Sequence, residues 1–464
     1  MTTTDATALR SATSTLVVVS AAAFLAGLDL FIVNIAFPDI RSAFGGANLG
    51  AMSWILNAYT LVFAAFLAPA GRLGDRYGHR PVFLWGVLVF SAGSLVCGFS
   101  VSFAMLLAAR VFQALGAAMV MPSSLALLLA AVPDTKRAAA VSIWSAVGAI
   151  AAALGPPVGG VLVGASWRCI FLVNVPVALL AFGFGRVILP RTPARGSGVP
   201  DLLGASVLVV GVSALVWVLV ELPAAPSAMV LVSVAAVGAV ALSFSVWRSR
   251  RHPVPALDLA VIRLLPMWLS SIAMVLFAAG FAAMLLCSVM LFTGVWHQSP
   301  VRAGLWLSLG PVVVVLVSLT LAGRMIDRFG TGGVAAVGSG IYALGIAYWL
   351  ARVGTRVDYP RDFLPGQVLT GIGVGLVIPS FSAVTALVLP GHQWGAGSAL
   401  TNTARQLGTV LGTAILTMVL QSGIELHTIR RGWFLIAGAA VGAAAVSAAV
   451  VIRVDAKRAR QQCV

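Results

Sequence analysis

The sequence predicts an all-α integral membrane protein with fourteen transmembrane helices, and three observations lead to that prediction. Apolar residues make up 60% of the chain and charged residues only 9%, whereas a globular domain carries about 25% charged residues. Fourteen apolar segments are long enough to cross a bilayer, which takes about 20 residues of helix. A charged, glycine-containing segment that starts at Gly71 returns in shorter form at Gly323, which indicates a bundle that was built twice.

The apolar segments divide the chain into two similar halves. Eight of them separate the two copies of the repeated segment, so both copies face the same side of the membrane. We expect a six-helix bundle at 1–189, a linker with two inserted helices at 190–265, a second six-helix bundle at 266–452 and a tail at 453–464. Duplicated bundles of this kind are common among membrane transporters. In chain order the segments lie at about 15–38, 50–71, 82–100, 103–131, 139–165, 170–189, 202–222, 227–247, 266–292, 301–322, 332–351, 363–389, 396–421 and 432–452.

Basic residues lie mainly in the links that face the cytoplasm if the N-terminus is inside, as Arg72, Arg186 and Arg248 illustrate. Because positively charged links stay on the inner side of a membrane, we expect a multi-pass protein with both termini in the cytoplasm. The net charge of +16 is concentrated in these links. We therefore expect no nucleic-acid partner.

The repeated segment is a link between two apolar spans. Its glycines allow a tight turn and close helix approach, and its arginines favour the cytoplasmic face. Its acid is free to pair with an arginine or with a helix N-terminus. Such a contact forms in one conformation and breaks in another, which would make the link a gate; a plain positively charged turn is the alternative. The residues assigned to this cytoplasmic gate loop are Gly71, Arg72, Asp75, Arg76, Gly78 and Arg80.

An acid, Asp29, lies inside the first predicted span. A carboxyl group inside a membrane is costly and is a functional site by default. Low dielectric favours the neutral acid and a nearby cation favours the carboxylate, so such a group can bind a proton on one side and release it on the other. Arg110 begins a helical stripe that continues with Gln113. We predict that Asp29 and Arg110 couple transport to protons; an acid that only packs helices and an arginine at the interface are the alternatives.

Further polar side chains recur at helical spacing on apolar segments. Asn402, Arg405 and Gln406 share one face of the segment at 396–421. Lipid cannot satisfy these groups, so this face must meet a water-filled cavity or a polar partner. A weaker stripe on the segment at 50–71 includes Asn57. The predicted substrate path consists of Asn34, Asn57, Gln113, Asn402, Arg405 and Gln406.

The fifth predicted span, 139–165, is rich in glycine and carries two consecutive prolines. Glycines let helix backbones touch, and prolines remove backbone donors and bend a helix. We expect this span to act as a hinge or a seal, with simple tight packing as the alternative. The residues on which this prediction rests are Gly155, Pro156, Gly159 and Gly160.

Taken together, these motifs resemble the major facilitator superfamily, and within it the fourteen-helix drug:proton antiporters. The gate loop looks like the loop-2/3 signature of the superfamily, with His79 where Arg or Lys is more frequent. Ser142 and Ala151 stand where the antiporters favour glycine. The resemblance implies the major facilitator fold, with two six-helix bundles and two additional helices. Segments similar to the first-, fourth- and fifth-helix signatures are Leu28–Pro38, Ala109–Gly116 and Gly155–Gly160, the last followed by Trp167, Arg168, Phe171, Asn174 and Pro176.

The resemblance implies a proton-coupled antiporter that exports a small hydrophobic drug, antibiotic or secondary metabolite across the bacterial cytoplasmic membrane. Two intramembrane arginines against one clear acid favour a neutral, zwitterionic or anionic substrate. An importer or facilitator of a small nutrient on the same fold, and a membrane sensor that transports nothing, remain alternatives.

The motifs of other functional classes do not occur in the sequence. It contains no Walker loop, no zinc-protease motif and no link long enough for a catalytic domain. We therefore expect no enzyme activity, no ATP, no metal and no cofactor. The expected partners are a small-molecule substrate, protons and the lipid bilayer, and the expected assembly is a monomer.

Overall fold

The computed structural model of the chain describes residues 3–45, 49–132, 137–191, 198–222, 227–256, 259–389 and 394–462, which form helices joined by short turns and links. No strand occurs in these residues. The prediction of an all-α protein is therefore confirmed. The chain forms two compact units, each with its own set of packed helices.

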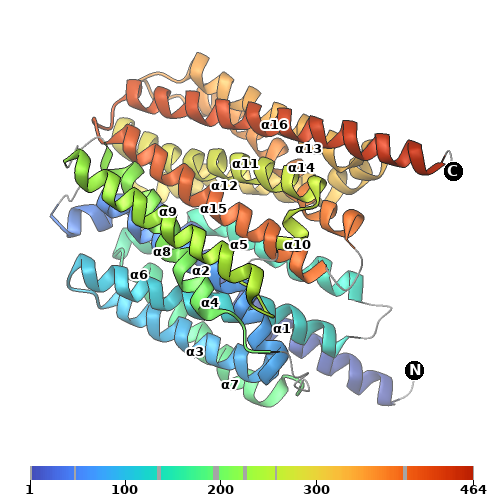
Figure 1. Cartoon of the computed structure of the whole chain (residues 1–464). Helices are drawn as coiled ribbons and strands as arrows, with labels where there is room; N and C mark the ends of the chain where they lie inside the picture. The colour runs from blue at the N-terminus through green and yellow to red at the C-terminus, as the bar shows by residue number, and fades with distance from the viewer. Residues whose placement is uncertain are drawn as a thin grey trace. The chain divides into compact units, whose positions relative to one another are not determined.

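Unit 1 comprises Met1–Ala47, Trp54–Leu215 and Ser233–Ala256. Its core is formed by buried aliphatic and aromatic side chains of α1 to α4 and α7. Figure 1 shows the helices of the N-terminal half in blue to green. The helices that lie wholly or largely in this unit are α1 (Thr3–Ala43), α2 (Leu49–Tyr77), α3 (His79–Gly98), α4 (Phe103–Ala131), α5 (Arg137–Ala165), α6 (Cys169–Leu172), α7 (Asn174–Ile188), α8 (Leu202–Glu221) and α9 (Ala228–Arg251).

Unit 2 comprises Asn48–Ser53, Val216–Val232 and Leu257–Val464. Three of its elements are single π-helical turns that continue into or follow an α-helix. Its elements are α10 (Leu259–Ile262), α11 (Leu265–Met290), η3 (Leu291–Val295), α12 (Pro300–Val317), η4 (Ser318–Ala322), α13 (Gly323–Arg352), η5 (Tyr359–Phe363), α14 (Leu364–Val388), α15 (Trp394–Leu420) and α16 (Leu426–Gln462).

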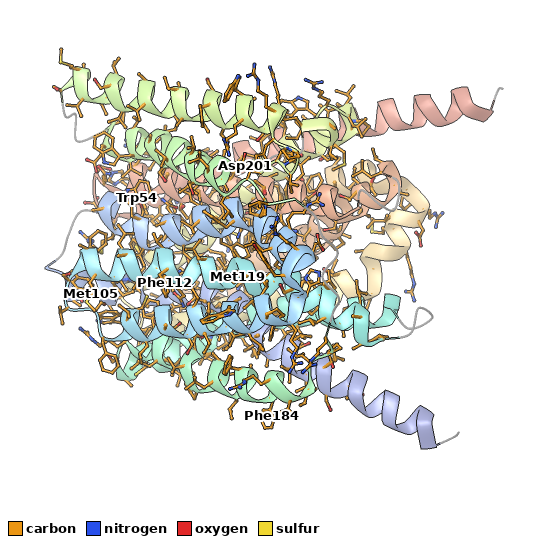
Figure 2. All side chains as sticks on the ribbon, turned by 60° about the horizontal axis from the view of Figure 1, so that its bottom comes forward. Trp54, Met105, Phe112, Met119, Phe184 and Asp201 are labelled. Carbon is orange, nitrogen blue, oxygen red and sulfur yellow. The ribbon has the colours of Figure 1, made fainter. Side chains whose placement is uncertain are left out.

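By length and hydropathy, twelve helices of the described part can cross a membrane. One of these, Pro300–Arg352, has 53 residues and contains both α12 and α13. Within α5, the stretch Ile150–Ala165 is apolar but shorter. These findings are consistent with fourteen spans, and that number remains a prediction. Large apolar side chains on the outside, such as Phe112 and Phe184, suit contact with lipid (Figure 2).

Glycines bring neighbouring helices into close contact in both units. A Cβ atom on Gly86 of α3 would lie 2.8 Å from the Cβ of Met119 on α4. In unit 2, a Cβ on Gly373 of α14 would lie 2.7 Å from the Cβ of Tyr342 on α13. Membrane helices have little hydrophobic drive to associate within lipid, so backbone contact at small residues is the packing that holds them.

The two copies of the repeated segment have the same backbone form. Residues expected in a link, from Gly71 to Tyr77, instead form the last turns of α2, and the chain turns only at Gly78, where φ is 91°. In the second copy, α13 begins at Gly323 and its helical path is interrupted at Gly330, where φ is 75°. Each copy thus confines its turn to a single glycine, because only glycine adopts this backbone readily. The sequence predicted a tight turn within this link; in the structure the turn is confined to Gly78, and Gly71 to Tyr77 are helical.

The inserted helices α8 and α9 are joined by a buried ion pair near the start of α8. Asp201 is 1% exposed, and its Oδ1 accepts from Arg248 Nε at 2.6 Å and from the backbone N–H of Gly204 at 2.8 Å. The carboxylate therefore caps α8, which stabilises a helix N-terminus. Figure 2 labels Asp201. Asp201 carries no motif that would have distinguished it in the sequence.

Candidate functional site

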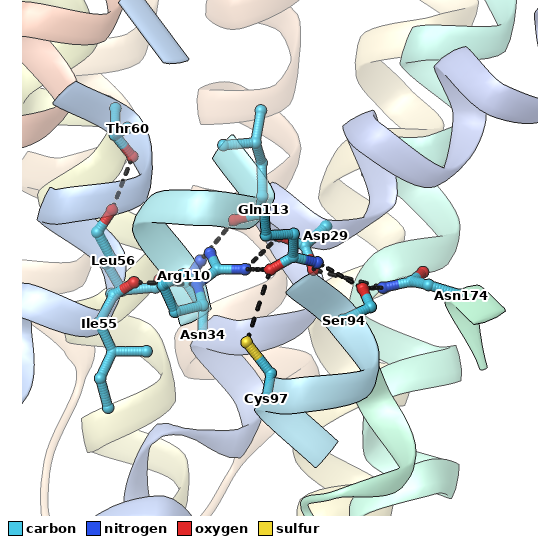
Figure 3. Close-up of polar contacts among 11 residues, drawn as sticks. Asp29, Asn34, Ile55, Leu56, Thr60, Ser94, Cys97, Arg110, Gln113 and Asn174 are labelled. Carbon is cyan, nitrogen blue, oxygen red and sulfur yellow. Dashed lines mark hydrogen bonds and ion pairs between the residues drawn. The ribbon is translucent and has the colours of Figure 1, made fainter. Parts of the chain in front are cut away.

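The centre of unit 1 contains a buried ion pair between Asp29 on α1 and Arg110 on α4. Asp29 is 0% exposed and Arg110 is 1% exposed. Arg110 Nη1 donates to Asp29 Oδ2, and Arg110 Nε donates to the carbonyl of Ile55 on α2 at 3.2 Å. The two residues that the sequence singled out are therefore in direct contact, and the guanidinium also connects them to α2 (Figure 3).

Two amide side chains complete the surroundings of the Asp29 carboxylate. Gln113 Nε2 donates to Asp29 Oδ1 at 2.9 Å, and Asn174 Nδ2 lies 3.4 Å from the same oxygen. Both amides also donate to Ser94 Oγ on α3, Gln113 at 2.6 Å and Asn174 at 3.1 Å. Gln113 Oε1 accepts from Arg110 Nη1 at 2.7 Å. The network thus connects α1, α3, α4 and α7 (Figure 3).

Aromatic rings cover the guanidinium of Arg110, and a thiol lies next to its neighbour Gln113. Its Cζ lies 4.1 Å from the ring centroid of Tyr59 and 5.7 Å from that of Phe171. Cys97 Sγ lies 3.9 Å from Gln113 Oε1. A cation over a desolvated aromatic face gains on the order of 2 kcal/mol. The arginine is therefore held by a carboxylate, a carbonyl and an aromatic ring without contact with water.

The network has a clear chemical consequence for Asp29. Its oxygens receive hydrogen bonds from Arg110, Gln113 and Asn174. Each of these contacts stabilises the carboxylate form, because a carboxylate only accepts hydrogen bonds. Removing either partner of such a buried pair leaves an uncompensated charge, which costs about 3–5 kcal/mol. The Asp29 carboxylate is therefore fixed to α4 and α7 by these three donors.

The structure also shows site residues that sequence reasoning missed. Ser94, Asn174 and Tyr59 are fully or almost fully buried, at 0%, 1% and 0% exposure. Asn174 was noted only as part of the exit from the fifth-helix signature, and Ser94 and Tyr59 were not noted. The available signal was a polar residue within an apolar segment, which in a membrane needs a partner.

The predicted substrate path of unit 1 is only partly brought together. Gln113 lies in the network around Asp29. Asn34 is half-buried, and its Nδ2 donates to the carbonyl of Leu30 in its own helix at 3.1 Å. Asn57 is buried within α2 at 1% exposure. The assignment of these residues to a substrate path remains a prediction.

In unit 2, α15 carries the polar stripe predicted for the thirteenth span. Arg405 Nη2 donates to Asn402 Oδ1 at 3.0 Å, and no carboxylate of the described residues contacts this arginine. Gln406 is 4% exposed, and its Nε2 has no hydrogen-bond partner among the described residues. This stripe therefore holds a cation and an amide without the acid that accompanies Arg110.

At the junction of α2 and α3, the predicted gate residues make specific contacts. Asp75 Oδ1 lies 3.2 Å from His79 Nε2 at the start of α3, so the acid pairs with the residue that departs from the family pattern. Arg80 Nη2 donates to the carbonyl of Arg186 on α7. Asp75 is 42% exposed, so its pair with His79 is a weak surface contact. Arg72 is exposed on the last turns of α2.

Two glycines of the α5 segment that is similar to the fifth-helix antiporter signature, Gly155 and Gly159, face α1. A Cβ on Gly155 would lie 2.7 Å from the Cβ of Phe31, and one on Gly159 would lie 2.9 Å from Ile32 Cγ1. Pro156 and Gly160 lie in the same continuous helix and are buried. Because α1 carries Asp29, this close contact fixes how the acid is presented to α4.

Within the described residues, no group of three or more His, Cys, Asp or Glu side chains is arranged to hold a metal ion.

The family model of the Major Facilitator Superfamily matches residues 19–296 and again 269–462. The chain belongs to this superfamily. It is 34% identical over 418 residues to the tetracenomycin C resistance and export protein of Streptomyces glaucescens, covering 88% of this chain and 76% of the relative. It is 30% identical over 439 residues to the methylenomycin A resistance protein of Bacillus subtilis (strain 168), covering 93% of each.

A solved structure supports the fold independently. The chain resembles a D-xylose-proton symporter with a TM-score of 0.67 at 14% identity, covering 94% of this chain and 96% of the other. At this identity the likeness concerns the fold alone. The predicted superfamily and its fold are confirmed, and the chain is a multi-pass membrane transporter of a family that binds small-molecule substrates.

Proposed function

We propose that this protein is a proton-coupled antiporter that exports a small, largely apolar drug, antibiotic or secondary metabolite across the bacterial cytoplasmic membrane. The relatives named above are resistance and export proteins for tetracenomycin C and methylenomycin A. The observation that carries the coupling is the buried Asp29–Arg110 pair. A carboxyl group that is shielded from water and held by a cation can exchange a proton only when the protein changes conformation, which links proton binding to transport.

The proton gradient can supply the energy for export. One charge that crosses at 100 mV provides about 2.3 kcal/mol. This corresponds to a concentration ratio of about 50-fold, because each 1.4 kcal/mol is a factor of ten. When a proton neutralises Asp29, the guanidinium of Arg110 loses its charge partner and the network around it weakens. We infer that this event favours the conformation that releases the proton to the cytoplasm.

The charge distribution supports the proposed substrate class. Asp29 is already paired with Arg110, so it offers no free charge to a cationic drug in this conformation. Arg405 has an amide partner but no acid among the described residues. A neutral, zwitterionic or anionic compound therefore meets fewer unfavourable charges than a polycation.

A drug-susceptibility panel in a pump-deficient host tests the proposal. Wild type should raise resistance to at least one apolar antibiotic, and Asp29→Asn and Arg110→Ala should return it to the level of the empty vector at equal membrane expression. Asp39→Asn is the matched control, because Asp39 lies on the same helix outside the network and is half-buried. Full resistance in Asp29→Asn would contradict the coupling role of this acid.

Transport in inverted vesicles separates export from the alternatives. An exporter takes up substrate into inverted vesicles when their interior is acidic, and collapsing the gradient stops the uptake. A proton-coupled importer of a nutrient would instead move its substrate out of such vesicles, and a facilitator would equilibrate its substrate whatever the gradient. A sensor that transports nothing would show no uptake at any gradient.

Four further features of the chain belong to the same proposal. The gate role of the α2–α3 junction, the seal formed by α5 against α1, the cytoplasmic position of both termini and the monomeric state follow from the sequence pattern. The domain boundaries at 189, 265 and 452 are proposed on the same basis. Cross-linking the α2–α3 junction should arrest transport if the junction is a gate.

A further inference from the structure

Asn174 has a buried oxygen to which no described residue donates a hydrogen bond. Its Nδ2 contacts Asp29 Oδ1 and Ser94 Oγ, while its Oδ1 has no hydrogen-bond partner among the described residues. Asn174 is 1% exposed. In Figure 3 the oxygen of Asn174 points away from Ser94 and the network. An unsatisfied buried acceptor costs about 1–3 kcal/mol. The unpaired oxygen of Asn174 therefore makes this arrangement less favourable than one in which the oxygen accepts a hydrogen bond.

A protonated Asp29 would need an acceptor that the present arrangement lacks. The O–H of a carboxylic acid must donate a hydrogen bond when it is buried. Arg110 presents only donors, because a guanidinium has no acceptor. Gln113 cannot turn its oxygen toward Asp29, because that oxygen already accepts from Arg110 Nη1 at 2.7 Å. If the Gln113 amide turned, its N–H groups would point at the guanidinium of Arg110, which is itself a donor and cannot accept a hydrogen bond.

Asn174 is the amide that is free to turn. A rotation of its terminal torsion by about 180° exchanges Nδ2 and Oδ1, and this torsion has two nearly equivalent settings. After the rotation, Oδ1 would occupy the place 3.4 Å from Asp29 Oδ1 and 3.1 Å from Ser94 Oγ that Nδ2 holds now. Ser94 can follow the change, because a hydroxyl either accepts or donates.

We propose that Asn174 is a two-state positioning residue that serves both protonation states of Asp29. With the carboxylate, Nδ2 donates to Asp29 Oδ1. When a proton from water binds to Asp29 Oδ1, the amide turns, Asn174 Oδ1 accepts the new O–H, and Ser94 donates to the same Oδ1. On release, the proton returns to water on the other side and the amide turns back. The inference rests on the proposed role of Asp29 in proton coupling.

The other groups around Asp29 do not offer an acceptor for the O–H of a protonated Asp29. The titratable groups that face it are Arg110 from α4, Tyr59 from α2 and Cys97 from α3. Residues 138–165 of α5, which packs on α1, contain no titratable side chain. From α6 and α7, which also pack on α1, come Cys169 and, twelve residues after Asn174, Arg186. Among these side chains, only the Asn174 amide both contacts the carboxylate and has an open acceptor.

Infrared difference spectroscopy of the full-length protein in lipid, titrated with pH, tests this inference. The carboxylic-acid C=O band that is absent in Asp29→Asn belongs to Asp29. In Asn174→Leu, this band should move to higher frequency, because the acid loses its acceptor. The pH at which the band is half developed should change little, because leucine removes both the N–H that donates to the carboxylate and the oxygen that would accept from the acid.

Ser94→Ala provides a second variant in case Asn174→Leu does not fold. It should move the band in the same direction by a smaller amount. Ser91→Ala is the matched control, because Ser91 is also buried and lies one turn earlier on α3; it should leave the band unchanged.

The outcomes separate the two proposals. If the wild type shows no band that Asp29→Asn removes, the proposed proton coupling at Asp29 fails. If the Asp29 band is present but neither Asn174→Leu nor Ser94→Ala moves it, Asn174 is only a packing residue and this inference fails while the proposed function stands.

Discussion

Arg110 in unit 1 and Arg405 in unit 2 are both arginines on apolar helices, but their surroundings differ. Arg110 is 1% exposed and contacts a carboxylate, an amide, a backbone carbonyl and an aromatic ring. Arg405 is half-buried and contacts the amide oxygen of Asn402. Unit 1 therefore neutralises its cation internally, whereas the described part of unit 2 leaves its cation without an acid.

From this difference we infer that the two units have different roles in transport. In unit 1 the cation, Arg110, is neutralised by Asp29, and this acid is the group that could bind and release a proton. A cation without an acid attracts electron-rich or anionic groups from outside, and it repels other cations. We therefore infer that unit 1 supplies the proton chemistry and that Arg405 of unit 2 influences which substrates are accepted.

The largest expected effect is on stability in unit 1. Asp29→Leu should lower the free energy of unfolding by about 3–5 kcal/mol, because Arg110 stays buried without its partner. Arg405→Leu should change it by no more than about 1 kcal/mol, because no ion pair is broken. Unfolding in detergent measures both. Equal losses in the two variants would show that the comparison between the arginines is wrong.

A double-mutant cycle should show a large coupling in unit 1 and a small one in unit 2. Asp29→Asn combined with Arg110→Gln should lose less stability than the sum of the single changes, with a coupling of up to about 3 kcal/mol. Asn402→Ala combined with Arg405→Gln should give about 1 kcal/mol or less, the value of one hydrogen bond. The same unfolding measurement supplies both cycles, and additivity in unit 1 would contradict the pairing.

Substrate charge should distinguish the two arginines in transport. Arg405→Gln should raise the KM for an anionic compound about tenfold and leave a neutral analogue nearly unchanged, because a charge-assisted hydrogen bond is worth about 1.5–3 kcal/mol. Arg110→Gln should reduce kcat for both compounds alike. Uptake into inverted vesicles, with the two analogues side by side, measures this. A uniform effect of Arg405→Gln would remove its proposed part in selection.

The smallest expected effect concerns the two turns that end the repeated segments. Gly78→Ala and Gly330→Ala should each cost about 1–2 kcal/mol of stability, because both glycines have a positive φ. Gly333→Ala is the control on α13, since a Cβ there meets nothing within 4 Å and its φ is not positive. It should be neutral or stabilising by about 0.5–1 kcal/mol. Similar losses in all three would show that the turns do not depend on glycine.

The sequence predicted the fold well because its signals are physical and strong. Low charge and long apolar segments admit few structures other than a helical membrane bundle, and the motifs around Asp29, Arg110 and Gly155 indicate one superfamily. The family and the fold are confirmed. The sequence also selected Asp29 and Arg110, because charges are rare inside a membrane.

Other parts of the site were beyond the sequence for identifiable reasons. Ser94 and Asn174 are small polar residues of a kind that membrane helices often carry, and their value depends on how each helix is rotated about its axis. The sequence did not predict the helical form of Gly71 to Tyr77, because glycines and charged residues between two apolar segments are typical of a loop. In the structure, the last turns of α2 contain these residues, and the chain changes direction only at Gly78, whose φ is positive.

The hydrogen bond from Arg110 to Ile55 has a mechanical consequence. Ile55 and Asp75 lie on the same helix, 20 residues apart in sequence, with Pro69 between them. Because an α-helix rises 1.5 Å per residue, the two points are about 30 Å apart along the helix. A small rotation of α2 that frees the guanidinium of Arg110 would also move the end of this helix at Asp75. A single helix therefore connects the surroundings of Asp29 with the α2–α3 junction, and Pro69 is the position where a bend can absorb part of the motion.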